Sequence, residues 1–168
     1  MKKIETRKLV MVALLIGLNI VFSRIISISA WNFKISLTFT TLLVAGYLYG
    51  PLWAALVGGV GDLIGSLLFP IGAYNPLFTV TAVVSGLIFG YFHYDNTELR
   101  NTILACTINQ FGVSLLLNSL FIAITYKTSY LALLSTRLIQ CVVMLVLEFI
   151  IIKLLEPLFP RLKEMLKK

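Results

Sequence analysis

Long apolar stretches, separated by short polar or turn-forming segments, account for most of the chain. Six of them are candidates for membrane-spanning helices: residues 9–26, 36–50, 51–69, 77–92, 101–125 and 131–156. A helix needs roughly 20 residues to cross the hydrocarbon core of a bilayer, so the second and fourth stretches are short spans. The pattern predicts an all-α integral membrane protein, a six-helix bundle that forms a single transmembrane domain over residues 1–168.

The boundary between the second and third stretches depends on the dipeptide Gly50-Pro51. Proline suits the first turn of a helix and glycine suits the position just after the end of one, so this pair favours two separate helices. If the dipeptide did not interrupt the helix, the two stretches would merge and the chain would have five spans.

The composition supports a membrane location. Hydrophobic residues make up 59% of the 168 residues and charged residues 12%, whereas about 25% of residues are charged in an ordinary soluble domain. The two cysteines, Cys106 and Cys141, lie within apolar stretches and His93 is the single histidine, so we expect neither a disulfide framework nor a metal site. No nucleotide-binding loop and no catalytic constellation occurs in the sequence, so we expect that the chain is not an enzyme.

The net charge of +7 comes mostly from residues at the ends of the apolar stretches, which indicates membrane topology rather than a nucleic-acid partner. Alternating spans place ten basic residues on one side of the bilayer. They place four on the other, namely Arg24, Lys34, Lys127 and Arg137. Because the more basic side of a membrane protein faces the cytoplasm, both termini are predicted to be cytoplasmic.

Five charged or amide side chains fall within the outer half of the predicted spans: Arg24, Asp62, Asn118, Arg137 and Gln140. A charge inside a span costs about 2.5–3.5 kcal/mol, so such residues usually face a cavity or pair with one another. We expect these five to converge on a ligand pocket in the outer half of the bilayer.

Each of these five polar residues also has a structural alternative. Asp62 can form an ion pair with Arg24 or Arg137 that only joins helices, and Arg24 can extend to the lipid headgroups. Asn118 and Gln140 can instead form hydrogen bonds between helices without contacting a ligand.

Aromatic residues gather in and beside the predicted outer segments. Rings accompanied by a few polar groups suit a pocket for a flat heteroaromatic ligand, although an interfacial aromatic belt would give the same pattern. The candidates for the pocket are Trp31, Phe33, Tyr74, Asn75, Phe78 and Thr79. Glu148 lies deeper, towards the cytoplasmic side, so we expect it outside this pocket.

Two segments carry a resemblance to a known family: YGPLWAALVGGVGDLIGSLLFPIGAYNPLFTVTAVVSGLIFGYF at residues 49–92 and STRLIQ at residues 135–140. The chain resembles the substrate-binding subunit, or S component, of an energy-coupling factor (ECF) vitamin transporter, and more closely its folate-specific, FolT-type branch. The resemblance extends over the whole chain. Where the family loop commonly reads Gly-Ala-Tyr-Phe-Pro-Gly-Phe-Thr, this chain has Asn75 and Leu77 in place of the phenylalanine and the second glycine.

The resemblance implies a high-affinity binding subunit that captures folate outside the cell and performs no chemistry itself. Aromatic walls would hold the pterin ring, and Asp62, Asn118 or Gln140 would accept hydrogen bonds from its edge. Arg24 and Arg137 would bind the carboxylates, and the sequence leaves open which arginine pairs with Asp62. The alternatives are another heteroaromatic vitamin (riboflavin, thiamine or biotin), or a stand-alone ion-coupled carrier that uses Asp62.

The resemblance also implies partners. A transmembrane coupling subunit would dock on Ala13 and Gly17, which stand where the family has an Ala-x-x-x-Ala pair. Small residues four apart allow another helix to approach closely. Two cytoplasmic ATPases would use ATP, so this chain is expected to carry no cofactor. The implied location is the plasma membrane of a bacterium.

Overall fold

The computed structural model of the chain describes residues 6–29, 34–70 and 75–167. The first half contains α1 (Thr6–Arg24), two short strands β1 (Ile28–Ser29) and β2 (Lys34–Ile35), and then α2 (Thr38–Tyr49), α3 (Pro51–Leu68) and α4 (Pro76–His93). The second half contains α5 (Leu99–Thr107), the π-helical segment η1 (Ile108–Leu117), α6 (Asn118–Tyr126), α7 (Tyr130–Leu155) and α8 (Leu158–Lys167).

The all-helical class predicted from the apolar stretches is confirmed. Every predicted span corresponds to a helix, and the largest boundary difference is three residues, at Thr6, where α1 begins earlier than the predicted residue 9. Among the described residues, five helices are long and apolar enough to cross a membrane, with α5, η1 and α6 counted as one helix of 28 residues. The shorter α2 has 12 residues. The β1–β2 pair and α8 were not predicted as regular structure.

Gly50 and Pro51 separate α2 from α3. Gly50 has a φ of 90°, in the left-handed region that favours glycine, and its N–H donates to the carbonyl of Gly46 at 2.9 Å. Pro51 occupies the first turn of α3, where its missing N–H costs nothing. The two stretches are therefore separate helices, and the alternative in which they merge is wrong.

Close backbone contacts fix α2, α3 and α4 against one another. A Cβ atom on Gly90 would lie 2.3 Å from the Cα atom of Pro51, and one on Gly86 would lie 2.5 Å from the backbone oxygen of Ala54. No side chain fits at these distances, so glycine is required at both positions. Phe89 of α4 is fully buried between these helices and belongs to their hydrophobic core.

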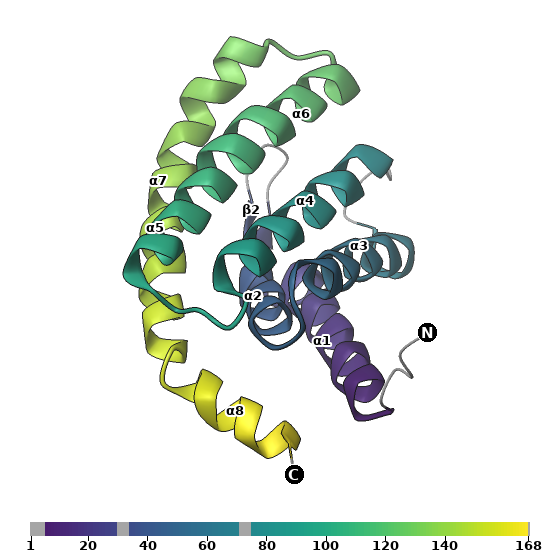
Figure 1. Cartoon of the computed structure of the whole chain (residues 1–168). Helices are drawn as coiled ribbons and strands as arrows, with labels where there is room; N and C mark the ends of the chain where they lie inside the picture. The colour runs from purple at the N-terminus through teal and green to yellow at the C-terminus, as the bar shows by residue number, and fades with distance from the viewer. Residues whose placement is uncertain (1–5, 30–33, 71–74, 168) are drawn as a thin grey trace.

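The helices form two groups. α1 to α4 pack on one another, while α5, η1, α6 and α7 form a second layer beside them, with α8 extending from the end of α7 (Figure 1). α4 contacts both groups because it packs on α2 and α3 and also on α5 and η1. A cavity lies between the groups, and the residues that line it come from both.

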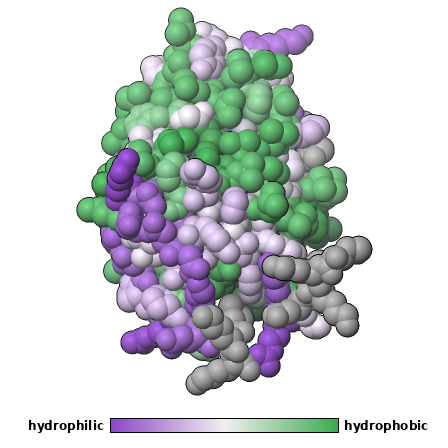
Figure 2. Space-filling model, viewed as in Figure 1, coloured by the Kyte–Doolittle hydropathy of each residue, from purple (hydrophilic) through white to green (hydrophobic). Residues whose placement is uncertain are grey.

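Large apolar side chains cover much of the outer surface. Exposed examples come from separate helices, including Val10 at 62%, Leu52 at 77% and Leu131 at 76% of their maximal accessible area. Figure 2 shows hydrophobic side chains over the upper and central part of one face, with hydrophilic side chains gathered mainly towards its lower end. Such extensive exposure is unfavourable in water and favourable against lipid, so the surface suits a bilayer.

Candidate ligand-binding site

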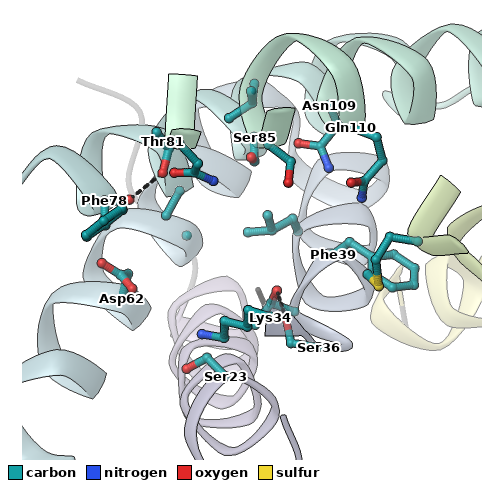
Figure 3. Close-up of a pocket in the computed structure, with 18 of the residues that line it drawn as sticks. Ser23, Lys34, Ser36, Phe39, Asp62, Phe78, Thr81, Ser85, Asn109 and Gln110 are labelled. Carbon is teal, nitrogen blue, oxygen red and sulfur yellow. Dashed lines mark hydrogen bonds between the residues drawn. The ribbon is translucent and has the colours of Figure 1, made fainter. Parts of the chain in front are cut away.

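A cavity of about 630 Å³ lies between the two helix groups. Small-molecule sites usually have volumes of about 300–1,000 Å³. In Figure 3, Asp62 and Gln110 lie on opposite sides of this space, with Lys34, Phe39 and Ser85 also at its edge. The sequence-predicted site residues that line it are Arg24, Asp62, Asn75, Phe78, Asn118, Arg137 and Gln140.

The structure thus brings the five intramembrane polar residues together at one cavity, as expected, although their contact with a ligand stays a prediction. Thr79 supports the site indirectly, because its hydroxyl donates to Asp62 Oδ2 at 2.9 Å. The remaining candidates Trp31, Phe33 and Tyr74 lie outside the described residues. Asn75 caps the N-terminus of α4 by accepting the N–H of Leu77 at 2.9 Å, so its side chain also shapes the loop entry into α4.

Asp62 and Arg24 form an ion pair at the cavity wall. Nη2 of Arg24 lies 3.2 Å from Oδ1 of Asp62, and the two side chains are 10% and 19% exposed. Asp62 therefore has two partners, Arg24 and Thr79, one for each carboxylate oxygen. This geometry answers the question that the sequence left open, because Arg24 is the arginine that pairs with Asp62.

Arg137 is buried at the same cavity without such a partner. It is 5% exposed, and within the described part of the chain its side chain forms no ion pair or hydrogen bond, so its buried Nε atom is unsatisfied. The helix α7 presents Arg137, Gln140, Met144 and Glu148 to the cavity, at the three- and four-residue intervals of one helix face. An unpaired buried guanidinium is unfavourable, so it is suited to an anionic ligand group.

Lys34 adds a third cation to Arg24 and Arg137, although it was not among the predicted site residues. It lines the cavity from β2, and its backbone oxygen accepts the amide of Gln140 Nε2 at 2.8 Å, which ties β2 to α7. Burial, and to a smaller degree the positive charge of Arg24, lower the pKa of Lys34 to about 8, while Asp62 acts in the opposite direction. The charge of Lys34 is therefore sensitive to pH just above neutrality.

Glu148 also lines the cavity, so the expectation that it lies outside the pocket is wrong. The cavity extends further along α7 than the outer polar residues indicate. Glu148 is 1% exposed, and its Oε1 atom accepts hydrogen bonds from Asn109 Nδ2 at 3.1 Å and Gln110 Nε2 at 2.7 Å. Sequence reasoning missed both amides, although two adjacent carboxamides in an apolar span are a usable signal of a polar site.

The π-helical segment η1 explains why adjacent residues face the same cavity. A π-helix has more residues per turn than an α-helix, so neighbouring side chains are separated by a smaller angle. The cavity-lining positions are 109, 110, 113, 114 and 118, so that 109 and 113, and 110 and 114, are four residues apart and 113 and 118 are five apart. Asn109 and Gln110 can therefore both reach Glu148, and Asn118 joins the same wall with a buried Oδ1 atom that has no partner among the described residues.

Comparison with known proteins agrees with this architecture. A family model described as the S component of ECF-type riboflavin transporters matches residues 3–158. The folate transporter FolT of Clostridium novyi (strain NT) is 33% identical over 153 residues, covering 90% of this chain and 88% of that protein. FolT of Leuconostoc mesenteroides subsp. mesenteroides is 32% identical over 149 residues, covering 84% and 80%.

A solved structure supports the same relationship. A crystal structure of FolT bound with folic acid matches this fold with a TM-score of 0.80 and 32% sequence identity, over 86% of this chain and 88% of that one. Matches of this extent in both sequence and structure include the helices that build the cavity. The chain therefore belongs to the family of S components of ECF-type transporters.

Proposed function

We propose that this chain is the membrane-embedded subunit that binds folate for an ECF-type uptake complex. The observation that carries the proposal is Arg137, a buried guanidinium without an acidic partner in the described structure, at a cavity of small-molecule size. Folate ends in a glutamate with two carboxylates, and arginine binds carboxylates with paired, charge-assisted hydrogen bonds. The relatives named FolT, one of them solved with folic acid bound, support the same ligand.

Riboflavin is the second candidate because the matching family model is described by that vitamin. Riboflavin has no carboxylate, so it would leave Arg137 without an acidic partner at the cavity. Desolvated cations favour a ligand that supplies negative charge. The charge of the cavity wall therefore favours folate.

In this proposal the chain is a multi-pass protein of the bacterial plasma membrane and a transport subunit rather than an enzyme. Six helices cross the bilayer with both termini in the cytoplasm, and the cavity opens to the outside. ATP hydrolysis takes place on partner subunits that this chain meets through a transmembrane coupling subunit. The exposed face of α1 that carries Ala13 and Gly17 supports such a contact, since a Cβ atom on Gly17 would meet nothing within 4 Å.

The proposed ligand is tested by calorimetric titration of the purified chain in detergent with folic acid and, separately, with riboflavin. We expect folic acid to bind at one site per chain, and far more tightly than riboflavin. Mass spectrometry of small molecules that copurify from cells grown in rich medium should find a folate. Tight riboflavin binding with no folate binding would contradict the proposal.

Folic acid affinity should fall as the pH rises through about 8. Lys34 has a pKa of about 8, so its amine is mostly protonated at pH 7 and mostly neutral at pH 9. The protonated amine attracts the ligand's carboxylates, so binding is strongest below this pKa, and the loss between pH 7 and pH 9 should reach up to about tenfold. Titration calorimetry across this range measures the effect.

Lys34→Arg is the matched control for this pH profile, because the guanidinium stays charged throughout the range. The ionisation of folic acid affects the affinities of both proteins equally, so the difference between their pH profiles gives the contribution of the Lys34 charge. Parallel profiles for the two proteins would show that the Lys34 amine does not face the ligand.

Ala13→Trp should leave folic acid binding by the isolated chain unchanged and should stop folate uptake by the assembled complex. The substitution adds a large ring to an exposed position on α1, away from the cavity, where the proposed coupling subunit must approach closely. Uptake of labelled folate by cells that contain the full complex measures the effect. Ile139→Trp is the control, since Ile139 is 70% exposed on α7. Equal uptake by the two variants would exclude α1 as the docking face.

A further inference from the structure

We propose that Glu148, Asn109 and Gln110 form a subsite that recognises the hydrogen-bond donor edge of the ligand's ring, the 2-amino-4-oxo edge of a pterin. The inference rests on the proposed function and assigns specificity to Glu148, about three turns after Arg137 on α7, and to two amides of η1. The sequence had pointed instead to Asp62, Asn118 and Gln140 as acceptors for this edge.

The three side chains form one hydrogen-bonded cluster in the cavity wall. Both amides donate to the same carboxylate atom, Oε1 of Glu148, from 3.1 Å and 2.7 Å. Asn109 is 8% exposed, Gln110 3% and Glu148 1%. Figure 3 shows Asn109 and Gln110 extending from their helix towards the cavity. The cluster is therefore held by its own hydrogen bonds and isolated from bulk water.

This arrangement leaves three buried acceptors without a donor. They are Oε2 of Glu148, Oδ1 of Asn109 and Oε1 of Gln110, none of which has a hydrogen-bond partner in the described part of the chain. The thiol of Cys106 also lies near the carboxylate, but a thiol is only a weak donor. Since buried acceptors are normally satisfied, a cluster of three is suited to a ligand that supplies several N–H donors.

Asp62 is less suited to this role. Its two carboxylate oxygens already accept from Arg24 at 3.2 Å and from Thr79 at 2.9 Å. An acceptor that is already satisfied gains less from a new donor than an unsatisfied one does. Of these two acidic side chains, Glu148 is therefore the one with an unsatisfied carboxylate oxygen.

The chemistry of the ring edge distinguishes the candidate vitamins. A pterin presents two adjacent donors, the 2-amino group and N3–H, followed by the 4-oxo acceptor. A flavin presents its N3–H between two carbonyl acceptors, which would face the unsatisfied oxygens of the cluster and be repelled. A site built of acceptors rejects a ligand edge that lacks matching donors, so the cluster favours a pterin.

The cluster and Arg137 are separated along α7, as the donor edge and the carboxylates are separated in folate. Glu148 lies eleven residues after Arg137 on the same face of α7, which is about 16 Å along a helix. Folate likewise carries its donor edge at one end and its carboxylates at the other. An acceptor cluster and an unpaired cation that lie about three turns apart along α7 can therefore hold the molecule in one orientation.

The test is titration calorimetry on wild type and Glu148→Gln with two ligands, folic acid and its analogue in which a methyl group replaces the 2-amino group. The substitution keeps the side-chain size but turns one acceptor into a donor. We expect Glu148→Gln to weaken folic acid binding at least tenfold. The methyl analogue should bind wild type at least tenfold more weakly than folic acid and lose little further in the variant, because the same interaction has already been removed.

Glu156→Gln is the matched control, since Glu156 follows the end of α7, pairs with Lys153 and lies outside the cavity. Its folic acid affinity should equal that of wild type. The thermal unfolding midpoint of the ligand-free Glu148→Gln variant separates lost recognition from lost folding, and it should stay close to the wild-type value.

Additive losses from the variant and the analogue, or unchanged folic acid binding in Glu148→Gln, would overturn the inference while leaving folate as the ligand. Absence of folic acid binding to wild type would overturn the proposed function and this inference together.

Discussion

Arg137→Met is expected to weaken folic acid binding by about 100-fold or more while leaving the ligand-free protein as stable as wild type, or more stable. The guanidinium is buried and has no acidic partner among the described residues, so its desolvation is uncompensated until a ligand arrives. A charge-assisted hydrogen bond contributes about 1.5–3 kcal/mol, and a bidentate contact between a guanidinium and a carboxylate contributes more. Methionine fills a similar volume without the charge. The substitution should therefore lower the affinity for folic acid while leaving the stability of the ligand-free protein unchanged or raising it.

Two measurements on the same sample separate these effects. Calorimetric titration gives the affinity, and the thermal unfolding midpoint with and without folic acid gives the stability and the stabilisation by the ligand. Lys127→Met is the matched control, because it removes one positive charge from an exposed position after α6 that does not line the cavity. Similar small losses of affinity in the two variants would show that Arg137 does not bind the ligand. A large drop in the stability of ligand-free Arg137→Met would show that the guanidinium serves the fold.

The helices were predictable because lipid imposes a simple rule on sequence. A helix in a bilayer must be apolar over most of its length, so its limits coincide with the limits of the apolar stretches. Gly50 and Pro51 marked a helix break for a local reason, the left-handed φ of glycine and the missing N–H of proline. The two-residue strands of the β1–β2 pair are too short for any periodic pattern to indicate.

Part of the site was predictable for the same reason. Charged residues such as Asp62 and Arg137 are costly in lipid, so their presence indicated a cavity or a partner. What the sequence left open was their pairing, which depends on how α1, α3 and α7 are placed relative to one another. Arg24 and Asp62 are 38 residues apart in sequence, and only the packing of α1 on α3 brings them together.

The residues that sequence reasoning missed depend on tertiary structure. Lys34 faces the cavity because its backbone is tied to Gln140, a residue 106 positions away. Asn109 and Gln110 both reach Glu148 from η1, where the π-helical turn narrows the angle between neighbouring side chains, and no apolar periodicity in the sequence signals that change. Glu148 was excluded on the assumption that the pocket occupies only the outer half of the bilayer, whereas the cavity follows α7 further.

The Arg24–Asp62 ion pair gives the second large expected effect, this time on stability. Asp62→Leu leaves the largely buried Arg24 without its acidic partner. Removal of one partner from a fully buried pair costs about 3–5 kcal/mol, and these side chains are 10% and 19% exposed, so we expect a smaller but still large loss. Arg24→Leu should destabilise the protein similarly, although Thr79 still donates to Asp62. The double variant Arg24→Leu/Asp62→Leu should recover most of the loss, because an apolar pair leaves no unpaired charge. Thermal unfolding midpoints of the four ligand-free proteins in detergent measure this coupling.

The same four proteins also test the alternative of a stand-alone ion-coupled carrier. Such a carrier needs Asp62 to release and take up a proton or to bind an ion, whereas the structure holds this carboxylate between Arg24 and Thr79. If the pair is structural, the double variant should fold and support folate uptake that depends on the ATPases and withstands a proton ionophore. Loss of uptake in a stable double variant that still binds folic acid, together with ionophore-sensitive uptake in wild type, would favour ion coupling. A double variant as unstable as Asp62→Leu would show that the two charges do not compensate each other, because their removal together should otherwise leave no buried charge unpaired.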